Sequence, residues 1–205
     1  MSSMSGVPRG RRRFRLLLVA YLAFVGLGLP DAVTGVAWPS IRETFGLDQD
    51  GLGPLLSCAA AGYLASSLAA GGLVRRLGIG RLLAASSALV AVALFGYATT
   101  GFWPVFLLCA VALGAGGGAI DAALNLFVAV AFGARQLNWL HAFYGVGASL
   151  GPLLMTAVLA AGWSWRWGNA AIACVLAALA LAYFATRDVW SVAIAPEGAG
   201  PGGGD

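Results

Sequence analysis

Two aspartates lie inside long apolar stretches of the sequence and have closely similar surroundings. The segment around Asp31 reads GLGLPDA and the segment around Asp121 reads GGGAIDA, so both fit the pattern G-x-G-x-x-D-A, ninety positions apart. A carboxylate can take up and release a proton, so the pair predicts two proton-carrying sites. The G-x-G element does not indicate a dinucleotide-binding loop, because no strand precedes it and the surrounding run is too long and apolar.

The composition places these aspartates in a membrane. The chain has 205 residues, of which 60% are hydrophobic and 10% charged, and its mean hydropathy is +0.86. A soluble domain has about 25% charged residues, and a chain this apolar could not cover its surface with polar groups. Disorder is excluded by the same numbers. Nucleic-acid binding is not expected despite a pI near 9.3, because the 12 arginines stand mostly at the edges of apolar runs.

Six runs are long enough to cross a bilayer, which requires about 20 apolar residues. They predict an all-α membrane protein with spans at residues 16–38, 53–74, 81–100, 104–132, 137–161 and 167–186. The first run could alternatively be a secretory signal peptide, but it is long for one and five further spans follow. We therefore expect a basic N-terminus at 1–15, a transmembrane domain at 16–187 and a Gly/Pro-rich tail at 188–205.

The arginines predict the orientation of the spans. Counted with the N-terminus inside, ten arginines fall on the cytoplasmic side and only Arg42 and Arg166 fall outside. We therefore expect a multi-pass protein of the plasma (inner) membrane with both termini in the cytoplasm. Tryptophans at the outer ends of the spans predict an aromatic belt at headgroup level. These are Trp38, Trp103, Trp163, Trp165 and Trp167.

Six spans divide into three plus three, and the repeated motif falls in the first span of each half. Spans one and four then run in opposite directions, which is the arrangement of an inverted-topology repeat. Asp31 is expected toward the outer side and Asp121 toward the inner side. A buried charge is a functional candidate by default, although each aspartate could instead be a structural polar group between helices.

Several polar residues near the two aspartates are candidates for the same site. Pro30 is expected to kink or loosen the first span beside Asp31. Asn125 follows Asp121 by one helical turn, so it could orient that carboxylate or bind a hydroxylated ligand. Asn138 and His141 share a face of the fifth span and are further substrate-binding candidates, with His141 alternatively an interfacial contact or a proton relay.

Small residues predict close helix contacts. Gly147, Gly151 and Pro152 in the fifth span form a small-xxx-small face, and the glycines at 114–118 are expected to do the same in the fourth. An enzyme is not expected, because the sequence contains no nucleophile–histidine constellation and no phosphate loop. We likewise predict no cofactor and no metal site, since the three cysteines lie on different spans without ligand spacing.

At these positions the sequence resembles the N-terminal half of a major facilitator superfamily transporter. The connection GGLVRRLGIGR between spans two and three is similar to that superfamily's motif at Gly71, Arg76, Gly78 and Arg81, although Arg75 stands where an aspartate is expected. The segments AWP after span one and NWLHAFYG at the start of span five resemble the fucose–proton symporter group. This resemblance implies a packing or gating role for the connection and proton coupling at Asp31 and Asp121.

The predicted function is proton-coupled secondary transport of a small polar solute, with a sugar implied by the resemblance. The expected partners are the lipid bilayer, protons, a small-molecule substrate and a second six-helix half, supplied by another chain or a second copy. No nucleic-acid partner is expected. Two alternatives remain open: efflux of a drug or metabolite by the same fold, and a truncated, inactive half that acts only as a membrane interaction protein.

Overall fold

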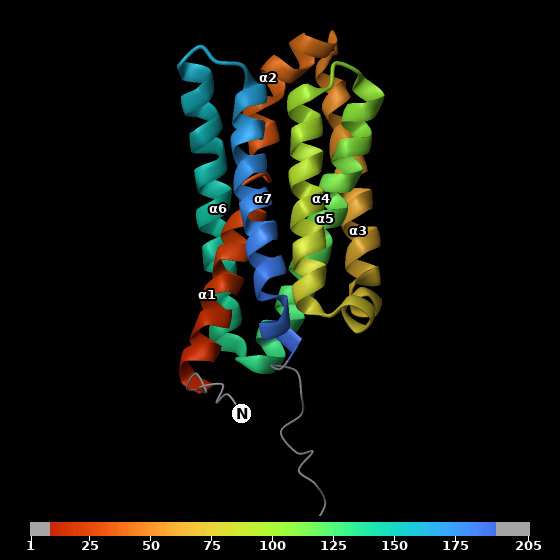
Figure 1. Ribbon diagram of the computed structural model, residues 1–205. Helices are drawn as coiled ribbons and strands as arrows, with labels where there is room; N and C mark the ends of the chain where they lie inside the picture. Colours follow the sequence, from red (N-terminus) through yellow and green to blue (C-terminus); the bar gives the residue numbers. More distant parts are fainter. Residues whose placement is uncertain (1–8, 192–205) are drawn as a thin grey trace, which may run out of the picture.

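The computed structural model describes residues 9–191 as a bundle of long helices (Figure 1). The elements are α1 (Arg9–Gly28), α2 (Val33–Phe45), the 3-10 turn η1 (Gln49–Gly51), α3 (Leu52–Leu77), α4 (Ile79–Thr99), α5 (Trp103–Ala131), α6 (Ala134–Ala160) and α7 (Trp165–Ser191). No strand occurs in this range, and six stretches are long and apolar enough to span a bilayer. The predicted all-α architecture with six spans is confirmed.

The first span is divided between two helices. α1 ends at Gly28 and α2 begins at Val33, with Pro30 and Asp31 in the turn between them. Pro30 has no backbone N–H and cannot continue the hydrogen-bond ladder of α1, which explains the position of the break. α2 then continues to Phe45, seven residues beyond the predicted end. Gly46 ends α2 in the left-handed conformation, with φ of 65°.

This longer first span changes the expected depth of Asp31. The candidate membrane span runs over Leu16–Phe45, so Asp31 lies near its middle rather than toward its outer end. Asp121 lies past the middle of Trp103–Ala131, as expected. The two carboxylates therefore differ less in their position along the bundle than the sequence predicted. The reason is that polar residues beyond Trp38, such as Arg42 and Glu43, continue the helix although they end the apolar run.

The predicted terminal segments are only partly within the described part of the chain. Residues 1–8 of the basic N-terminus and 192–205 of the tail lie outside it. α1 already begins at Arg9, inside the predicted N-terminal segment, and α7 continues to Ser191.

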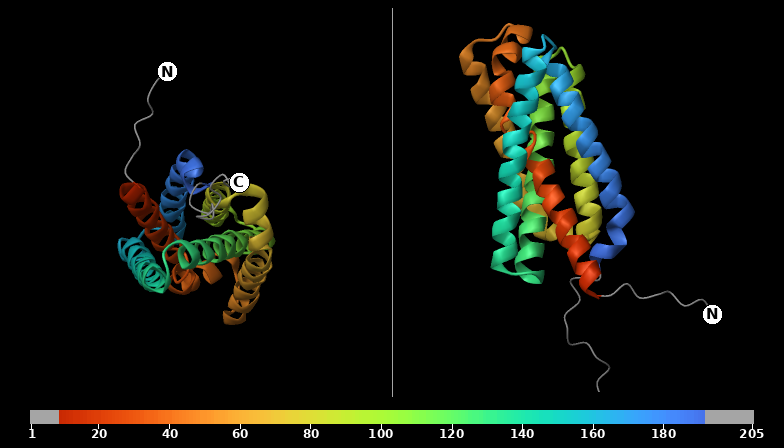
Figure 2. Two further views of the ribbon diagram at one scale, coloured as in Figure 1. Left: turned by 90° about the horizontal axis from the view of Figure 1, so that it is seen from below. Right: turned by 90° about the vertical axis from the view of Figure 1, so that its left-hand side faces the viewer.

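The helices pack in pairs that the inverted repeat relates to one another. α3 packs mainly against α5, α1 against α6, and α4 against α7, and α4 also packs extensively against α5 (Figure 2). Exchanging the first three spans with the last three converts the α3–α5 contact into the α6–α1 contact and leaves the α4–α7 contact in place. These three contacts have the symmetry that the motif around the two aspartates predicted, whereas the contact of α4 with α5 has no equally extensive counterpart between α7 and the first span.

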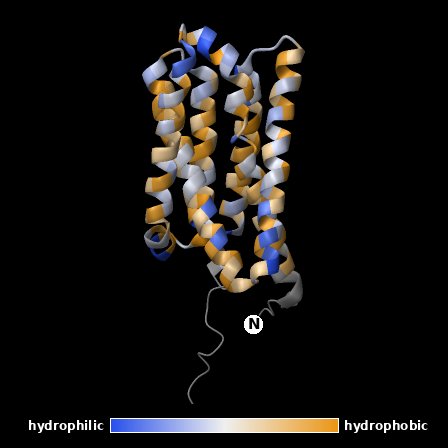
Figure 3. Cartoon of the chain, turned by 180° about the vertical axis from the view of Figure 1, so that it is seen from behind, coloured by the Kyte–Doolittle hydropathy of each residue, from blue (hydrophilic) through white to orange (hydrophobic). Residues whose placement is uncertain are grey.

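Hydrophilic residues gather toward the two ends of the bundle, and apolar residues cover its length (Figure 3). We call the end that carries the start of α1 and the α3–α4 and α5–α6 connections the arginine-rich end. Arg75, Arg76, Arg81 and Arg135 are exposed there. Large apolar side chains such as Leu68 and Leu108 are exposed between the two ends, as expected for a surface in contact with lipid.

Four of the five predicted belt tryptophans at the opposite end divide into two groups, and Trp103 is half-buried against the core. Trp163 and Trp167 are exposed, in agreement with a belt at the membrane surface. Trp38 and Trp165 are instead buried in a core that includes Phe106. Their indole N–H groups donate to Gln49 and Thr44 respectively, at 3.3 and 3.1 Å. The predicted belt is therefore wrong for these two residues, because α2 extends past Trp38 and brings Thr44 onto Trp165.

Arg166 ties the end of α4 to α7. Its guanidinium donates to the backbone oxygens of Tyr97 and Ala98, at 3.3 and 3.0 Å, and lies 4.7 Å from the centre of the Trp165 ring. The last carbonyls of a helix have no partner within the helix, so a charged donor stabilises them. We expect Arg166→Met to lower the free energy of unfolding by about 1–3 kcal/mol.

Thermal unfolding in detergent checks this prediction. The matched control is Arg42→Met, on the exposed surface of α2, which should leave the melting temperature close to that of the wild type. Equal losses in the two variants would show that the contacts of Arg166 with α4 contribute nothing specific.

Candidate functional site

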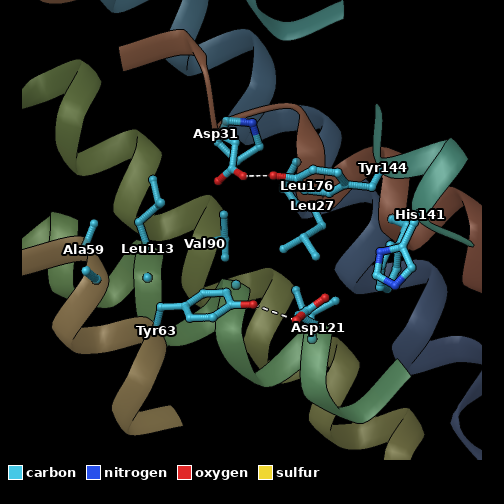
Figure 4. Close-up of a pocket in the computed structure, with 16 residues that line it drawn as sticks. Leu27, Asp31, Ala59, Tyr63, Val90, Leu113, Asp121, His141, Tyr144 and Leu176 are labelled. Atoms are coloured by element: carbon cyan, nitrogen blue, oxygen red, sulfur yellow. Dashed lines mark hydrogen bonds between the residues drawn. The ribbon is translucent and has the colours of Figure 1, made fainter. Parts of the chain in front are cut away.

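A cavity of 510 Å³ lies in the bundle between the two aspartates, and all six spans line it (Figure 4). Most of its walls are apolar, with Leu27, Val90 and Leu176 among the side chains that face it. The titratable groups in its lining come from four elements: the α1–α2 turn, α3, α5 and α6. They are Asp31, Tyr63, Asp121, His141 and Tyr144.

Asp31 enters the cavity from the turn between α1 and α2. The Tyr144 hydroxyl of α6 donates a hydrogen bond to Asp31 Oδ2. Pro30 lines the same part of the cavity, and its effect on α1 is the reason that Asp31 lies in a turn rather than inside a continuous helix. The side chain of Asp31 remains exposed in the described chain and is thus accessible to water or a solute.

Asp121 lies in α5, and each of its two carboxylate oxygens has a donor. The Tyr63 hydroxyl of α3 donates to Oδ2 at 2.6 Å, and the Asn125 side-chain amide donates to Oδ1 at 2.9 Å. Asn125 can reach because a spacing of four residues places both side chains on one helix face. It does not line the cavity itself and is connected to it by its hydrogen bond to Asp121.

The other two predicted substrate-binding residues are separated by the structure. His141 lines the cavity and packs edge-to-face on Phe24, with 5.7 Å between ring centres. Asn138 lies one turn earlier on α6, is exposed, and is not part of the cavity wall. The structure thus brings His141 to the aspartates and leaves Asn138 toward the arginine-rich end.

The predicted packing residues of α6 lie against the first span. A Cβ atom at Gly147 would collide with the backbone oxygen of Val25, and one at Gly151 with that of Leu29. Pro152 follows within α6 and is half-buried. Glycine is thus needed at both positions for α6 to approach α1 and the α1–α2 turn this closely.

The four predicted residues between spans two and three lie at the arginine-rich end, away from the cavity. Gly71 and Arg76 belong to the last two turns of α3, and Arg81 to the first turn of α4. Gly78 joins the two helices with φ of 76°, a conformation that favours glycine. The cationic side chains at the C-terminus of α3 are favourably placed with respect to its dipole.

The sequence did not assign a role to the two tyrosines that hold the aspartates. Tyr144 could have been found from its spacing, because it follows His141 by three residues and so shares its helix face. Tyr63 has no comparable local signal. It lies 58 positions from Asp121 and contacts it only because α3 packs on α5.

The charged groups that line the cavity are mainly acidic. Among residues 9–191, two carboxylates face it, no arginine is in its lining, and His141 is the one basic side chain there. Within the part of the chain that the structure describes, no group of three or more His, Cys, Asp or Glu residues could hold a metal ion. The negative charge of a carboxylate in such surroundings is stabilised by hydrogen bonds from phenol and amide donors. Protonation, which removes the charge, is the alternative.

The fold and the cavity define a helical integral membrane protein with ionisable groups facing an internal space. The sequence is matched by the Major Facilitator Superfamily over residues 16–202, and the chain belongs to that family. This is a family of transporters rather than enzymes, and the resemblance to this superfamily stated from the sequence is confirmed.

Relatives and a solved structure extend the comparison. The chain is 26% identical over 144 residues to the glucose/mannose transporter GlcP of Bacillus subtilis (strain 168), over 69% of this chain and 36% of that protein. It is 28% identical over 137 residues to the sodium-dependent glucose transporter 1A of Mus musculus, over 65% of this chain and 32% of that protein.

The fold is similar to that of the proton:xylose symporter XylE bound to 6-bromo-6-deoxy-D-glucose, with a TM-score of 0.72 and 18% identity. This match covers 91% of the chain and 49% of the symporter. The chain therefore spans about a third of the length of the two relatives and about half of that solved structure.

Proposed function

We propose that this chain is one six-helix half of a secondary transporter that couples the movement of a small polar solute to protons. The observation that carries the proposal is the presence of two carboxylates, Asp31 and Asp121, on one internal cavity without an arginine beside them. Each carboxylate can bind a proton from the cavity. A solute in the same space can then experience a different charge and hydrogen-bonding pattern in each protonation state.

We infer that the solute is a sugar. One relative is named as a glucose/mannose transporter and another as a glucose transporter. The structural neighbour is named as a proton:xylose symporter. The cavity offers carboxylate acceptors, two phenol hydroxyls and an imidazole among apolar side chains. This mixture suits a ligand with several hydroxyl groups on an apolar ring frame. His141 is the proposed direct contact, and Asn125 acts by orienting Asp121.

A second six-helix half is part of this proposal. Asp31, Tyr63 and His141 line the cavity and are nevertheless exposed in the described chain, so their side of the cavity requires a cover before a solute can be enclosed. We place the arginine-rich end, the connection with Gly71, Arg76, Gly78 and Arg81, and both termini on the cytoplasmic side of the plasma (inner) membrane, following the arginine distribution.

Sodium is a second candidate for the coupling ion. Asn125 Oδ1 is buried and has no hydrogen-bond partner in the described structure, and it belongs to the side chain that donates to Asp121. The amide nitrogen of Asn125 faces Asp121 in this structure, so rotation of the amide by half a turn would be needed to place its oxygen beside the carboxylate, where the two oxygens suit a hard cation. The name of the mouse relative also refers to sodium dependence.

Uptake into proteoliposomes tests the function and the ion together. The chain is reconstituted alone and with its second half, and uptake of radiolabelled glucose, mannose and xylose is followed under an inward proton gradient, an inward sodium gradient or neither. We expect accumulation only with the proton gradient, abolished by a protonophore. Accumulation driven by the sodium gradient alone would show that sodium, and not the proton, is the coupling ion. Export of the solute driven by the gradient would show that the protein is an efflux transporter and not a symporter.

A further inference from the structure

We propose that Tyr63 and Tyr144 are a matched pair of positioning residues, each of which donates a hydrogen bond to the ionised aspartate of the opposite repeat. Protonation of either aspartate then weakens one of two equivalent hydrogen bonds between the repeats. This inference rests on the proposed proton coupling and deepens it. It gives a specific structural consequence to protonation at each aspartate.

The two hydrogen bonds exchange partners between the repeats. Asp31 belongs to the first three spans and its donor Tyr144 to the last three. Asp121 belongs to the last three spans and its donor Tyr63 to the first three. Both tyrosines come from the middle span of their repeat, and both aspartates from the first. The two contacts are therefore the same contact made twice, once in each direction.

The motif glycines fix the position of the same tyrosines. Gly28 precedes Asp31 by three residues, and a Cβ there would collide with the backbone oxygen of Tyr144. Gly118 precedes Asp121 by three residues, and a Cβ there would collide with the backbone oxygen of Tyr63. In each repeat the glycine admits the tyrosine backbone and the aspartate accepts the hydroxyl of the same tyrosine.

The first glycine of each motif faces the remaining span of the opposite repeat, but the two contacts differ. A Cβ at Gly116 would lie 2.7 Å from the Ser86 backbone oxygen of α4, whereas a Cβ at Gly26 would lie 2.6 Å from the end of the flexible Leu179 side chain of α7. The equivalence between the repeats therefore rests on the second glycine and the aspartate of the pattern G-x-G-x-x-D.

Protonation weakens this binding for a simple physical reason. A hydrogen bond from a phenol to a carboxylate is charge-assisted, and it loses that assistance when the acceptor becomes a neutral acid. The proton adds to a carboxylate oxygen from the water in the cavity, and no other covalent bond changes. Because donor and acceptor lie on different repeats, the change weakens a contact between the two three-helix units.

Few other groups face these two contacts. α4 and α7 contribute Val90 and Leu176 to the cavity wall and no charged group. The remaining titratable residue in the lining is His141 on α6. The two contacts also differ in one respect. Asp121 has Asn125 one turn later, whereas the corresponding position after Asp31 is Gly35. Loss of the tyrosine hydroxyl is therefore expected to affect Asp31 more than Asp121.

Infrared titration of the purified 205-residue chain tests the pairing directly. A protonated carboxylic acid has its own C=O stretching band, and the bands of the two aspartates are assigned by their loss in Asp31→Asn and Asp121→Asn. Tyr144→Phe should move the midpoint of the Asp31 band to higher pH by about one unit and leave the Asp121 band in place. Tyr63→Phe should shift the Asp121 band in the same direction, by less, and spare the Asp31 band.

The matched control is Tyr183→Phe. The Tyr183 hydroxyl is buried in α7 and has no hydrogen-bond partner in the described structure, so its removal should move neither band. Tyrosine variants that shift both bands equally, or neither, would overturn the pairing. If a variant unfolds, replacing the same tyrosine with 3-fluorotyrosine, a stronger hydrogen-bond donor, should move the midpoint of its aspartate to lower pH, and an unchanged midpoint would count against the pairing.

This result is independent of uptake. If each tyrosine variant shifts only its own aspartate band but no gradient-driven uptake occurs, the tyrosine–aspartate pairing is supported and the transport proposal is contradicted. If proton-driven uptake occurs but the band shifts do not follow the pairing, the transport proposal is supported and the pairing between repeats is contradicted.

Discussion

Asp31→Asn and Asp121→Asn should each abolish the accumulation of solute against its gradient while leaving exchange of solute across the membrane measurable. Asparagine keeps the volume of the side chain and can accept a hydrogen bond from Tyr144 or Tyr63, so the cavity should retain its shape. It cannot bind a proton at neutral pH. Movement of solute and movement of protons are therefore separated without removal of the binding site.

The expected size of this effect follows from the gradient. With a difference of one pH unit and one proton carried per solute molecule, accumulation can reach about tenfold, since one unit corresponds to about 1.4 kcal/mol. The variants should equilibrate at a ratio of one. Counterflow, in which labelled solute enters vesicles preloaded with unlabelled solute, requires no proton movement and should persist.

Asp50→Asn is the matched control for both substitutions. Asp50 is exposed in η1, outside the cavity, and the same chemical change there should leave accumulation at the wild-type level. Undiminished accumulation in Asp31→Asn would remove that residue from proton coupling, and the same holds for Asp121→Asn. Loss of counterflow together with accumulation would show instead that the aspartate is needed to bind the solute.

The number of spans and the positions of the aspartates were predictable because both leave local signals. A bilayer requires continuous apolar runs, and a carboxylate in such a run is conspicuous among so few charges. The repeat around Asp31 and Asp121 was visible for the same reason, since glycines and an aspartate at fixed spacing are rare in combination. Even the break beside Pro30 followed from the chemistry of one residue.

The partners of the aspartates were not predictable because they depend on helix packing. The spacing of Tyr144 from His141 indicates a shared helix face, but Tyr144 lies 113 positions from Asp31 and nothing local indicates that its hydroxyl binds that carboxylate. Burial of Trp38 was missed for a related reason. Its position in an apolar run was read correctly, but the groups that cover it are Gln49 in η1 and Trp103 in α5, which only the fold brings beside it.

These observations connect the glycines of the motif to its aspartates. The glycines at Gly28 and Gly118 were first noticed only as neighbours of a carboxylate. In the structure they admit the backbone of the tyrosine that binds that carboxylate. The packing of the repeats and the state of the proton site therefore depend on the same few atoms. A change in the packing should change the site, even without a change in any titratable group.

Gly28→Ala and Gly118→Ala should both destabilise the chain, by about 1–3 kcal/mol each. The added methyl group would meet the backbone oxygen of Tyr144 or Tyr63, and a backbone atom cannot move aside as a flexible side chain can. α6 must then withdraw from α1, or α3 from α5. We expect a lower melting temperature in detergent for each variant.

Gly35→Ala and Gly145→Ala are the matched controls. Both glycines lie within helices, and nothing stands within 4 Å of a Cβ atom added at either position. Alanine is the better helix former by about 1 kcal/mol in an exposed helix, so these variants should be as stable as the wild type or more so. Equal losses at all four glycines would assign the effect to helix propensity and not to the close approach of the repeats.

The variants that retain a folded state also report on the proton site. When Gly118→Ala forces α3 away from α5, the Tyr63 hydroxyl should withdraw from Asp121, and the infrared band of that aspartate should move to higher pH as in Tyr63→Phe. Gly28→Ala should act in the same way on Asp31 through Tyr144. If the Gly118→Ala variant is destabilised but its Asp121 band does not move, helix packing and proton binding are independent of each other. The glycine and the aspartate of the repeated motif would then be neighbours in the sequence without acting together.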